Sequence, residues 1–225
     1  MNTSIPTNAR LNTASTTPAG TTGPALSARG LSKSYQSPVL TKLDLDIEQG
    51  QFVAIMGPSG SGKSTLLHCL SGMDRPTDGS VLLGETEMTT LSEKELAALR
   101  LTRFGFVFQQ AHLMATLCLL DNIVLPGFLA GLRPRPEVTA RGEELMERMG
   151  IAELAASSVT EVSGGQLQRA GICRALINDP GIVFADEPTG ALNSATALQI
   201  LDLLGQVHAS GTTLVMVTHD AQVAA

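Results

Sequence analysis

The stretch GPSGSGKST, residues 57–65, decides the fold of this chain. It matches the pattern G-x-x-x-x-G-K-[ST], in which backbone N–H groups of a glycine-rich loop bind phosphate oxygens. Gly60 and Gly62 leave room for that approach, because they carry no side chain and accept a positive φ. The stretch therefore predicts a site for a nucleoside triphosphate. We expect all its residues to line this site: Gly57, Pro58, Ser59, Gly60, Ser61, Gly62, Lys63, Ser64 and Thr65.

The flanking residues favour a phosphate site over a plain Gly/Ser loop. Residues 51–56, QFVAIM, predict a buried strand, and residues 63–70 predict a helix whose partly positive N-terminus points at the phosphates. Lys63 is placed to reach the β- and γ-phosphates, and the Ser64 hydroxyl to bind Mg²⁺. Strand, loop and helix together predict a nucleotide site that also holds Mg²⁺.

Composition limits the partners of the chain. Its 225 residues suffice for one large domain or two small ones, and its formal net charge is -6. Because blocks of Lys and Arg with interleaved aromatics are lacking, we expect no nucleic acid as main partner. We find no apolar run long enough to span a bilayer and no secretory signal, which predicts a soluble, cytoplasmic protein.

The cysteines Cys69, Cys118 and Cys173 are an odd number and form no CxxC pair. This usage is typical of a reducing compartment and favours neither a disulfide framework nor a zinc site. We expect all three to be small, buried apolar residues.

The amino-acid composition and patterning of the chain change near residue 25. Residues 1–24 are rich in Thr, Ser, Asn, Ala and Pro and poor in large apolar residues, which predicts a disordered tail. Residues 25–35 and 39–50 then alternate apolar and polar residues, which predicts two antiparallel strands joined around residues 37–38.

Farther on, short apolar runs alternate with helical patterns, which predicts an α/β sheet covered on both faces. Ser92 and Glu95 form a capping box at the start of one helix. We expect strands over residues 80–83, 104–108, 181–185 and 212–217, and helices over residues 92–103, 117–150 in two or three pieces, 164–178 and 194–208, the last capped by Ser194.

Polar residues follow the carboxyl ends of these predicted strands, where open α/β sheets bind their ligands. Asp186 and Glu187 follow one strand, and His219 follows another. One carboxylate is placed to hold Mg²⁺ through water opposite Ser64, and the next to orient a water for in-line attack. The alternative for such paired acids is a solvated charged turn, which fits poorly after a wholly apolar strand.

The stretch VSGGQ, residues 162–166, is a second anion-binding corner at the start of a helix. Ordinary turn chemistry is the alternative, but the long helix directly behind the corner favours ligand binding.

Four motifs, in this order, resemble the nucleotide-binding domain of ABC transporters: GPSGSGKST, VSGGQLQRAGICRAL, IVFADEPTGAL and VTHD. The resemblance covers residues 25–225, and it implies an α/β P-loop NTPase fold, the ABC ATPase core. This core has a mixed sheet, an antiparallel β subdomain and a helical subdomain at about residues 110–178. Family members normally continue beyond the equivalent of Ala225 with a helix and a β-hairpin, so we expect that hairpin to be absent here.

The resemblance implies an ATP-hydrolysing homodimer, or a pair with a similar ATPase. Each ATP would lie between the phosphate loop of one subunit and the signature corner of the other. That corner comprises Ser163, Gly164, Gly165 and Gln166.

The resemblance also implies individual roles. Glu187 would be the general base, His219 would contact the γ-phosphate, and Gln109 would sense Mg²⁺ and the attacking water. Tyr35 would stack on the adenine. The plain alternatives are a half-buried tyrosine at a strand end and a histidine that only caps a strand. The implied Mg²⁺ ligands are Ser64, Gln109 and Asp186.

Longer stretches, among them FGFVFQQAHLM and LLDNIVLPGFLAG, resemble the lipoprotein-release (LolD-type) and macrolide-export (MacB-type) ATPases. This implies a separate membrane permease, export of a lipoprotein, lipid, peptide or drug, and a peripheral position on the inner face of the cell membrane. The alternative is a non-transport ABC ATPase, such as a cell-division regulator of the FtsE type. Asn193 stands where the family usually has Asp, which puts communication between the two ATP sites in question.

Overall fold

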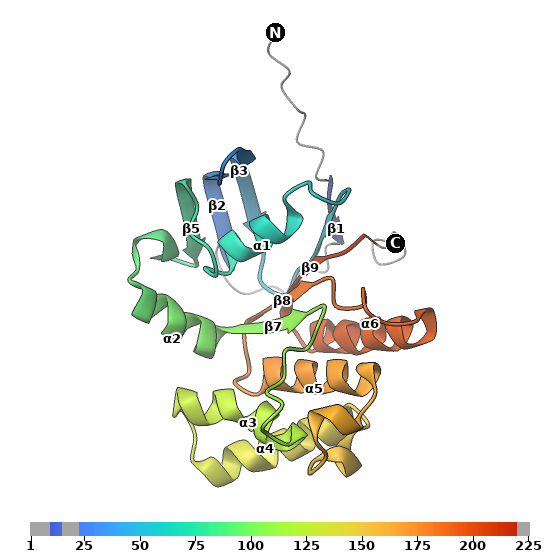
Figure 1. The fold of residues 1–225 in the computed structure, drawn as a ribbon. Helices are drawn as coiled ribbons and strands as arrows, with labels where there is room; N and C mark the ends of the chain where they lie inside the picture. The colour runs from blue at the N-terminus through green and yellow to red at the C-terminus, as the bar shows by residue number, and fades with distance from the viewer. Residues whose placement is uncertain (1–9, 15–22, 220–225) are drawn as a thin grey trace. The chain divides into compact units, whose positions relative to one another are not determined.

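The computed structural model describes residues 10–14 and 23–219 of the chain. The chain forms two compact units, one of Met1–Leu96 with Val215–Ala225 and the other of Ala97–Leu214. Each unit has strands and helices of its own (Figure 1). Within the described ranges, no helix is both long enough and apolar enough to cross a membrane.

The first unit contains a four-stranded sheet in the order β3-β2-β5-β6, with antiparallel pairing throughout. Leu26 of β2 lies opposite Ile47 of β3 and Leu83 of β5, and its side chain is fully buried. The two strands predicted from alternation are confirmed. The strands are β2 (Leu26–Ser34), β3 (Pro38–Ile47), β5 (Asp78–Leu83) and β6 (Thr86–Glu87). A 3-10 turn, η1 (Met88–Thr90), follows β6.

The predicted strand and helix on either side of the phosphate loop are confirmed. They are β4 (Phe52–Met56) and α1 (Lys63–Leu70). The core of this region holds Ile55 from the strand and Leu66 and Leu70 from the helix, all at most 1% exposed. The loop between them is therefore anchored at both ends in the apolar interior.

Residues Arg10–Ala14 form strand β1, which pairs antiparallel with β4. The predicted disorder of residues 1–24 is wrong for this segment. Pairing with a sheet edge uses backbone hydrogen bonds and needs no large apolar side chains, so composition does not reveal it. The prediction for residues 1–9 and 15–22 lies outside the described residues.

The second unit contains two parallel strands in register, with Phe108 opposite Asp186. Because of this register, Gln109 and Glu187 leave the two strands at the same edge. The strands are β7 (Phe104–Phe108) and β8 (Ile182–Asp186), and both were predicted.

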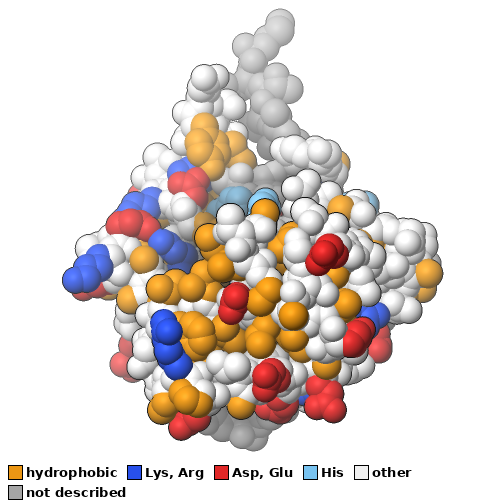
Figure 2. Space-filling model, turned by 60° about the horizontal axis from the view of Figure 1, so that its bottom comes forward, with side chains coloured by type: hydrophobic (Ala, Val, Ile, Leu, Met, Phe, Trp, Pro, Cys, Tyr) orange, Lys and Arg blue, Asp and Glu red, His pale blue; other side chains and the backbone are white. Residues whose placement is uncertain are grey.

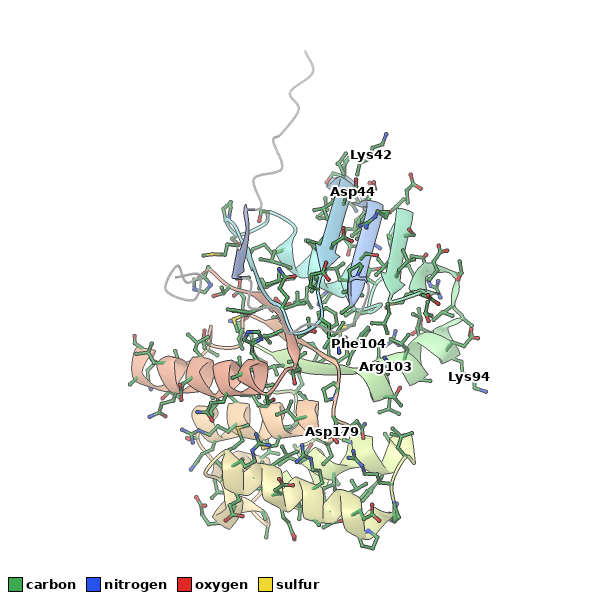
Figure 3. The ribbon with its side chains drawn as sticks, turned by 180° about the vertical axis from the view of Figure 1, so that it is seen from behind. Lys42, Asp44, Lys94, Arg103, Phe104 and Asp179 are labelled. Carbon is green, nitrogen blue, oxygen red and sulfur yellow. The ribbon has the colours of Figure 1, made fainter. Side chains whose placement is uncertain are left out.

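Aromatic contacts fix these two strands to each other. Phe104, labelled in Figure 3 at the start of β7, lies 5.1 Å from the ring of Phe184 in an edge-to-face arrangement. Phe106 stacks on Phe184 at 5.8 Å. Such pairs add to the burial of apolar area, so the register of β7 and β8 is well determined.

Helices fill the chain between β7 and β8, where the described residues form one isolated bridge, Cys118 with Ser158, and no named strand. Gly142 permits close packing, since a Cβ there would lie 2.6 Å from Val124 Cγ1. The helices are α3 (Leu119–Ala130), α4 (Arg135–Arg148), η2 (Ala152–Leu154), η3 (Val159–Glu161) and α5 (Gly164–Leu176).

Two helix starts test the capping predictions. The capping box at the start of α2 (Glu93–Arg103) is confirmed, because Ser92 N donates to Glu95 Oε2 at 2.8 Å and Glu95 N donates to Ser92 Oγ at 3.3 Å. Helix α6 (Ser194–Ala209) is capped by Asn193, whose Oδ1 accepts from Thr196 N at 3.0 Å. The predicted cap, Ser194, is wrong by one residue, because Asn caps as well as Ser and stands first.

The last predicted strand is confirmed as β9 (Thr213–Val217), with all its residues buried.

The burial predicted for the cysteines is confirmed for Cys69 and Cys173, where it raises the pKa of the thiols to about 11 and about 12. It is wrong for Cys118, which is half-buried and caps α3 by accepting from Asp121 N at 3.4 Å.

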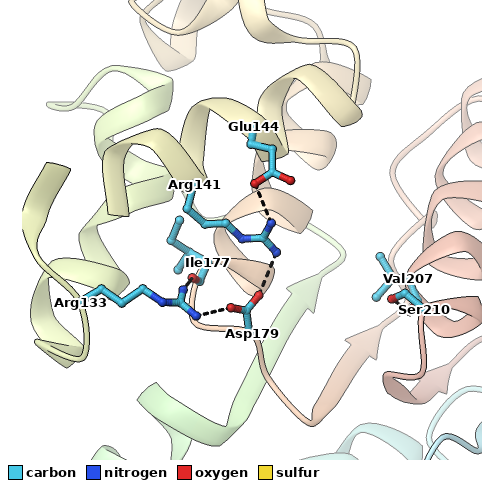
Figure 4. A network of polar contacts seen from close by, with 7 residues as sticks. All are labelled: Arg133, Arg141, Glu144, Ile177, Asp179, Val207 and Ser210. Atoms are coloured by element: carbon cyan, nitrogen blue, oxygen red, sulfur yellow. Dashed lines mark hydrogen bonds and ion pairs between the residues drawn. The ribbon is translucent and has the colours of Figure 1, made fainter. Parts of the chain in front are cut away.

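A polar network joins three segments of the second unit (Figure 4). Asp179, just after α5, pairs with Arg133 from the connection between α3 and α4. Its other oxygen lies 2.8 Å from Arg141 Nη2, and Arg141 Nη1 lies 3.0 Å from Glu144 Oε2. One carboxylate therefore ties the ends of α3 and α5 to the middle of α4.

Candidate active site

The phosphate loop, residues 57–65, leads from β4 into α1 in the first unit. Gly60 and Gly62 have φ values of 77° and 86°, in the left-handed region that favours glycine. Gly62 is the N-cap of α1 and provides no capping side chain. An anion bound at this helix start would face the partly positive end of α1.

Two polar side chains of the loop fit a phosphate ligand. Lys63 is 7% exposed, and its Nζ donates to the carbonyl of Pro58 at 2.9 Å, so the ammonium lies over the loop. Ser61 Oγ is buried and has no hydrogen-bond partner within the described part of the chain. Burying an unpaired hydroxyl is unfavourable, so an acceptor oxygen from a ligand suits this position.

Tyr35 and His219 also belong to the first unit. Tyr35 lies just beyond the end of β2, 61% exposed, and its hydroxyl donates to Asp74 Oδ2 at 2.5 Å. His219 is exposed and follows Thr218, whose N–H donates to the carbonyl of Ile55 at 3.2 Å. His219 therefore stands near the end of β4, where the phosphate loop begins.

In the second unit, Gln109 and Glu187 lie on neighbouring backbone segments. Glu187 has a φ of 46°, rare for a residue other than glycine, and turns the chain sharply after Asp186. Gly190 N donates to Glu187 O at 3.0 Å and closes this turn. A Cβ on Gly190 would lie 2.8 Å from Gln109 Nε2, so the Gln109 side chain packs against the turn that carries Glu187.

Gln168 is a residue that our sequence reasoning missed. Its side chain is buried in α5, and its Nε2 donates at 2.8 Å to Phe108 O and at 2.8 Å to Pro188 O. These carbonyls belong to the residue before Gln109 and the residue after Glu187. One amide group therefore ties both segments to the helix that starts with the signature corner. A polar residue on the buried face of a predicted helix is the signal that could have identified it.

The signature corner is an ordered helix start. Ser163 Oγ accepts from Gln166 N at 3.4 Å, and Gln166 Oε1 accepts from Ser163 N at 2.8 Å. This reciprocal capping box fixes the corner before any ligand binds. The Ser163 hydroxyl hydrogen can still be donated to an anion.

A groove of about 470 Å³ lies over the signature corner, between the starts of α5 and α6. The two helices touch there, because a Cβ on Gly165 would lie 2.6 Å from Thr196 Cγ2. The lining includes Arg169 and no acidic residue. Asn193 lines it as a neutral residue, so the groove suits an anion.

Mg²⁺ would have few protein ligands here. No group of three or more His, Cys, Asp or Glu side chains with metal-binding geometry occurs among the residues that the structure describes. Mg²⁺ commonly takes one or two protein ligands besides phosphate oxygens and water, so such a cluster is not required. Ser64 in the first turn of α1 and Asp186 at the end of β8 are residues of the type that would hold it.

A glycine-rich phosphate loop between a strand and a helix, with acids at the end of a second buried strand, defines a P-loop NTPase. The family model described as ABC transporter matches residues 40–190. The macrolide export ATP-binding/permease protein MacB 1/2 of Paracoccus denitrificans (strain Pd 1222) is 45% identical over 212 residues, 92% of this chain and 32% of that protein. This chain thus spans about a third of the length of that relative.

A relative of similar length is the uncharacterized ABC transporter ATP-binding protein YknY of Bacillus subtilis (strain 168). It is 44% identical over 197 residues, which are 85% of each chain. The dimeric structure of MJ0796, a bacterial ABC transporter cassette, superposes with a TM-score of 0.81 and 38% identity, covering 88% of this chain and 90% of that one. The chain belongs to the ABC transporter family and is an ABC ATPase, which confirms the predicted family and fold class.

Proposed function

We propose that this chain hydrolyses ATP as a dimer and thereby drives a membrane permease of the export type. The observation that carries the proposal is the presence of two anion-binding corners in one chain, the phosphate loop in the first unit and the signature corner in the second. Two such corners are needed when each ATP is held by two subunits. MJ0796 was solved as a dimer, also in a post-hydrolysis state with ADP and Pi, which supports this reading.

In this proposal the phosphate loop binds the triphosphate. The N–H groups of α1 and the Lys63 ammonium would offset its negative charge, and Ser64 and Asp186 would hold Mg²⁺. Bound Mg²⁺ would supply further neutralisation of the phosphate oxygens. His219, which follows β9 and lies near the end of β4, would hydrogen-bond the γ-phosphate.

Glu187 is proposed as the general base. Its left-handed backbone turns it away from the path of β8, and Gln109 packs against the same turn. The carboxylate would accept a proton from the attacking water, which Gln109 would help to orient. The contacts of Gln168 support this assignment, because they hold both backbone segments in place.

The partner subunit's ATP would bind at the groove over Ser163–Gln166. The preformed capping box, the single lining cation Arg169 and the lack of acidic lining residues all favour a triphosphate there. With Asn193 in place of the family's Asp, this groove lacks one negative charge next to the phosphates.

The permease partner and the position on the inner membrane face are inferred from the relatives. The name of the Paracoccus protein joins an ATP-binding and a permease part in one chain. A second groove of about 350 Å³ next to Gln109, lined by apolar residues such as Leu113, Val159 and Leu167, offers a partner surface. Figure 2 shows the side of the molecule that includes α3 and α4, where apolar side chains gather in patches separated by acidic ones.

The proposal predicts that Glu187→Gln abolishes steady-state ATP hydrolysis while ATP binding persists. Losing a general base lowers the rate by about 10²- to 10⁴-fold. The measurement is phosphate release by the purified protein at saturating Mg·ATP, with nucleotide binding measured in parallel. Glu153→Gln, an exposed residue of η2, is the matched control and retains the wild-type rate. Unchanged turnover in Glu187→Gln would refute Glu187 as the base.

A further inference from the structure

Lys33, Tyr35 and Asp74 form a compact polar cluster in the first unit. Asp74 accepts from Lys33 Nζ at Oδ1 (2.6 Å) and from the Tyr35 hydroxyl at Oδ2 (2.5 Å). Lys33 Nζ also donates to Arg75 O at 2.6 Å and lies 4.8 Å from the centre of the Tyr35 ring. One carboxylate thus holds both the tyrosine and the cation that covers it.

The cluster leaves one face of the tyrosine ring for a ligand. An ammonium at this distance is attracted to the ring face, so Lys33 covers one side while Asp74 holds the hydroxyl. Lys33 itself is 8% exposed, whereas Tyr35 is 61% exposed. The ring is therefore oriented before a ligand arrives, which reduces the entropy lost on binding.

The cluster is connected to the phosphate loop through α1. Met73 N and Asp74 N both donate to His68 O, in the last turn of this helix, at 2.9 and 3.1 Å. The first turn of the same helix belongs to the phosphate loop. A single short helix therefore sets the spacing between Asp74 and the loop, and through Asp74 the position of the Tyr35 ring.

The charge states keep the cluster intact at neutral pH. Burial opposes ionisation of Asp74, but the hydrogen bonds from Lys33 and Tyr35 outweigh it and lower the pKa of the carboxyl. The hydrogen bond to Asp74 raises the pKa of Tyr35, so the phenol keeps the proton that it donates. The carboxylate and the neutral phenol are thus the stable partners.

We propose that Lys33 and Asp74 are positioning residues, which hold the open face of Tyr35 where it stacks on the base of a nucleotide whose phosphates occupy residues 57–65. The inference rests on the proposed ATP binding. Stacking on the base then depends on the ion pair between Lys33 and Asp74 as well as on the Tyr35 ring.

The test compares two probes by calorimetry, Mg·ATP and Mg·tripolyphosphate, because only the first has a base. For Asp74→Ala we expect the affinity for ATP to fall about fivefold, as for loss of an aromatic contact, while the affinity for tripolyphosphate stays within about twofold. Adding Asp74→Ala to Tyr35→Ala should cause no further loss of ATP affinity, since the ring that Asp74 positions is already gone.

A second variant keeps the test valid if Asp74→Ala does not fold. Tyr35→Phe removes the hydroxyl that donates to Asp74 and retains the ring, so we expect a smaller loss of ATP affinity, about twofold, again without effect on tripolyphosphate. The matched control is Asp46→Ala, which breaks the exposed ion pair with Arg29 (2.6 Å) in the same sheet and should alter neither affinity.

Four results would overturn the inference. Wild-type ATP affinity in Asp74→Ala would show that Tyr35 needs no positioning. An equal loss of affinity for ATP and for tripolyphosphate in this variant would show that Asp74 has a merely structural role. Equal binding of both probes by the wild type would show that the base is not stacked, while the phosphate site stands. If the wild type binds neither probe, the proposed function fails together with the inference.

Discussion

At the scale of single residues, Gln168 illustrates how a buried polar group organises a site. The residue is 3% exposed, and its side-chain amide donates two hydrogen bonds of 2.8 Å to the carbonyls of Phe108 and Pro188, next to Gln109 and Glu187. A buried amide is stable only with its partners in place, and the carbonyls also lose a donor if it is removed. The positions of both neighbouring segments therefore depend on one side chain of α5.

We predict that Gln168→Leu lowers the free energy of unfolding by about 1–3 kcal/mol, because two carbonyls lose a donor in a buried site. It should also lower kcat for ATP hydrolysis more than it changes KM, since Gln109 and Glu187 shift relative to each other. Urea unfolding and steady-state kinetics measure the two effects. Gln206→Leu, which removes only an exposed contact to Asp202 (2.9 Å), is the control. A Gln168→Leu variant with the stability and the kcat of the wild type would contradict this role.

The structure around single motifs was also the part of the molecule that could best be predicted from the sequence. The pattern around Lys63 depends on local backbone chemistry, so it predicted the strand, loop and helix correctly. A polar residue on the buried face of a helix could have drawn attention to Gln168, but its two partners lie 60 and 20 positions away in the sequence, so no local pattern identifies them. The roles proposed for Tyr35, Gln109 and His219 remain predictions.

At the scale of elements, Asp179 connects α3, α4 and α5 through two arginines (Figure 4). Its backbone φ of 50° turns the chain immediately after α5, and this turn aims the carboxylate at Arg133 and Arg141. The side chain of Asp179 is 47% exposed, so each pair is partly screened by water. The gain in stability from these ion pairs is therefore modest.

We predict that Asp179→Asn lowers the free energy of unfolding by about 1 kcal/mol at low salt, because two partly exposed ion pairs are lost. The difference should shrink in 1 M salt, where the Debye length is about 3 Å. Thermal unfolding at two ionic strengths provides the measurement. Glu144→Gln removes only the peripheral contact to Arg141 and should change stability less. A salt-independent loss would argue against an electrostatic role.

Elements also show why parts of the fold could not be predicted. Strand β1 has the composition of a tail, and its backbone is paired with the edge of β4. Asn193 and Ser194 are both good capping residues, so the sequence alone could not decide between them. In both cases tertiary context selected one of several locally acceptable outcomes.

At the scale of the whole molecule, the proposed site residues are divided between two units. The phosphate loop, Tyr35 and His219 belong to the first unit, whereas Gln109, the acids Asp186 and Glu187 and the signature corner belong to the second. The second unit carries two separate features, the turn with Glu187 and the corner with Ser163. In the proposed dimer the turn serves the ATP of its own subunit, and the corner serves the ATP of the partner.

The central claim is that each ATP is shared by two subunits, and mixing two inactive variants tests it most directly. Lys63→Ala lacks the phosphate-loop cation, and Ser163→Arg blocks the signature corner. A mixed dimer then combines the intact loop of one variant with the intact corner of the other. We predict that each variant alone hydrolyses no ATP and that the 1:1 mixture regains phosphate release. A mixture that stays inactive, with mixed dimers verified, would contradict the shared site.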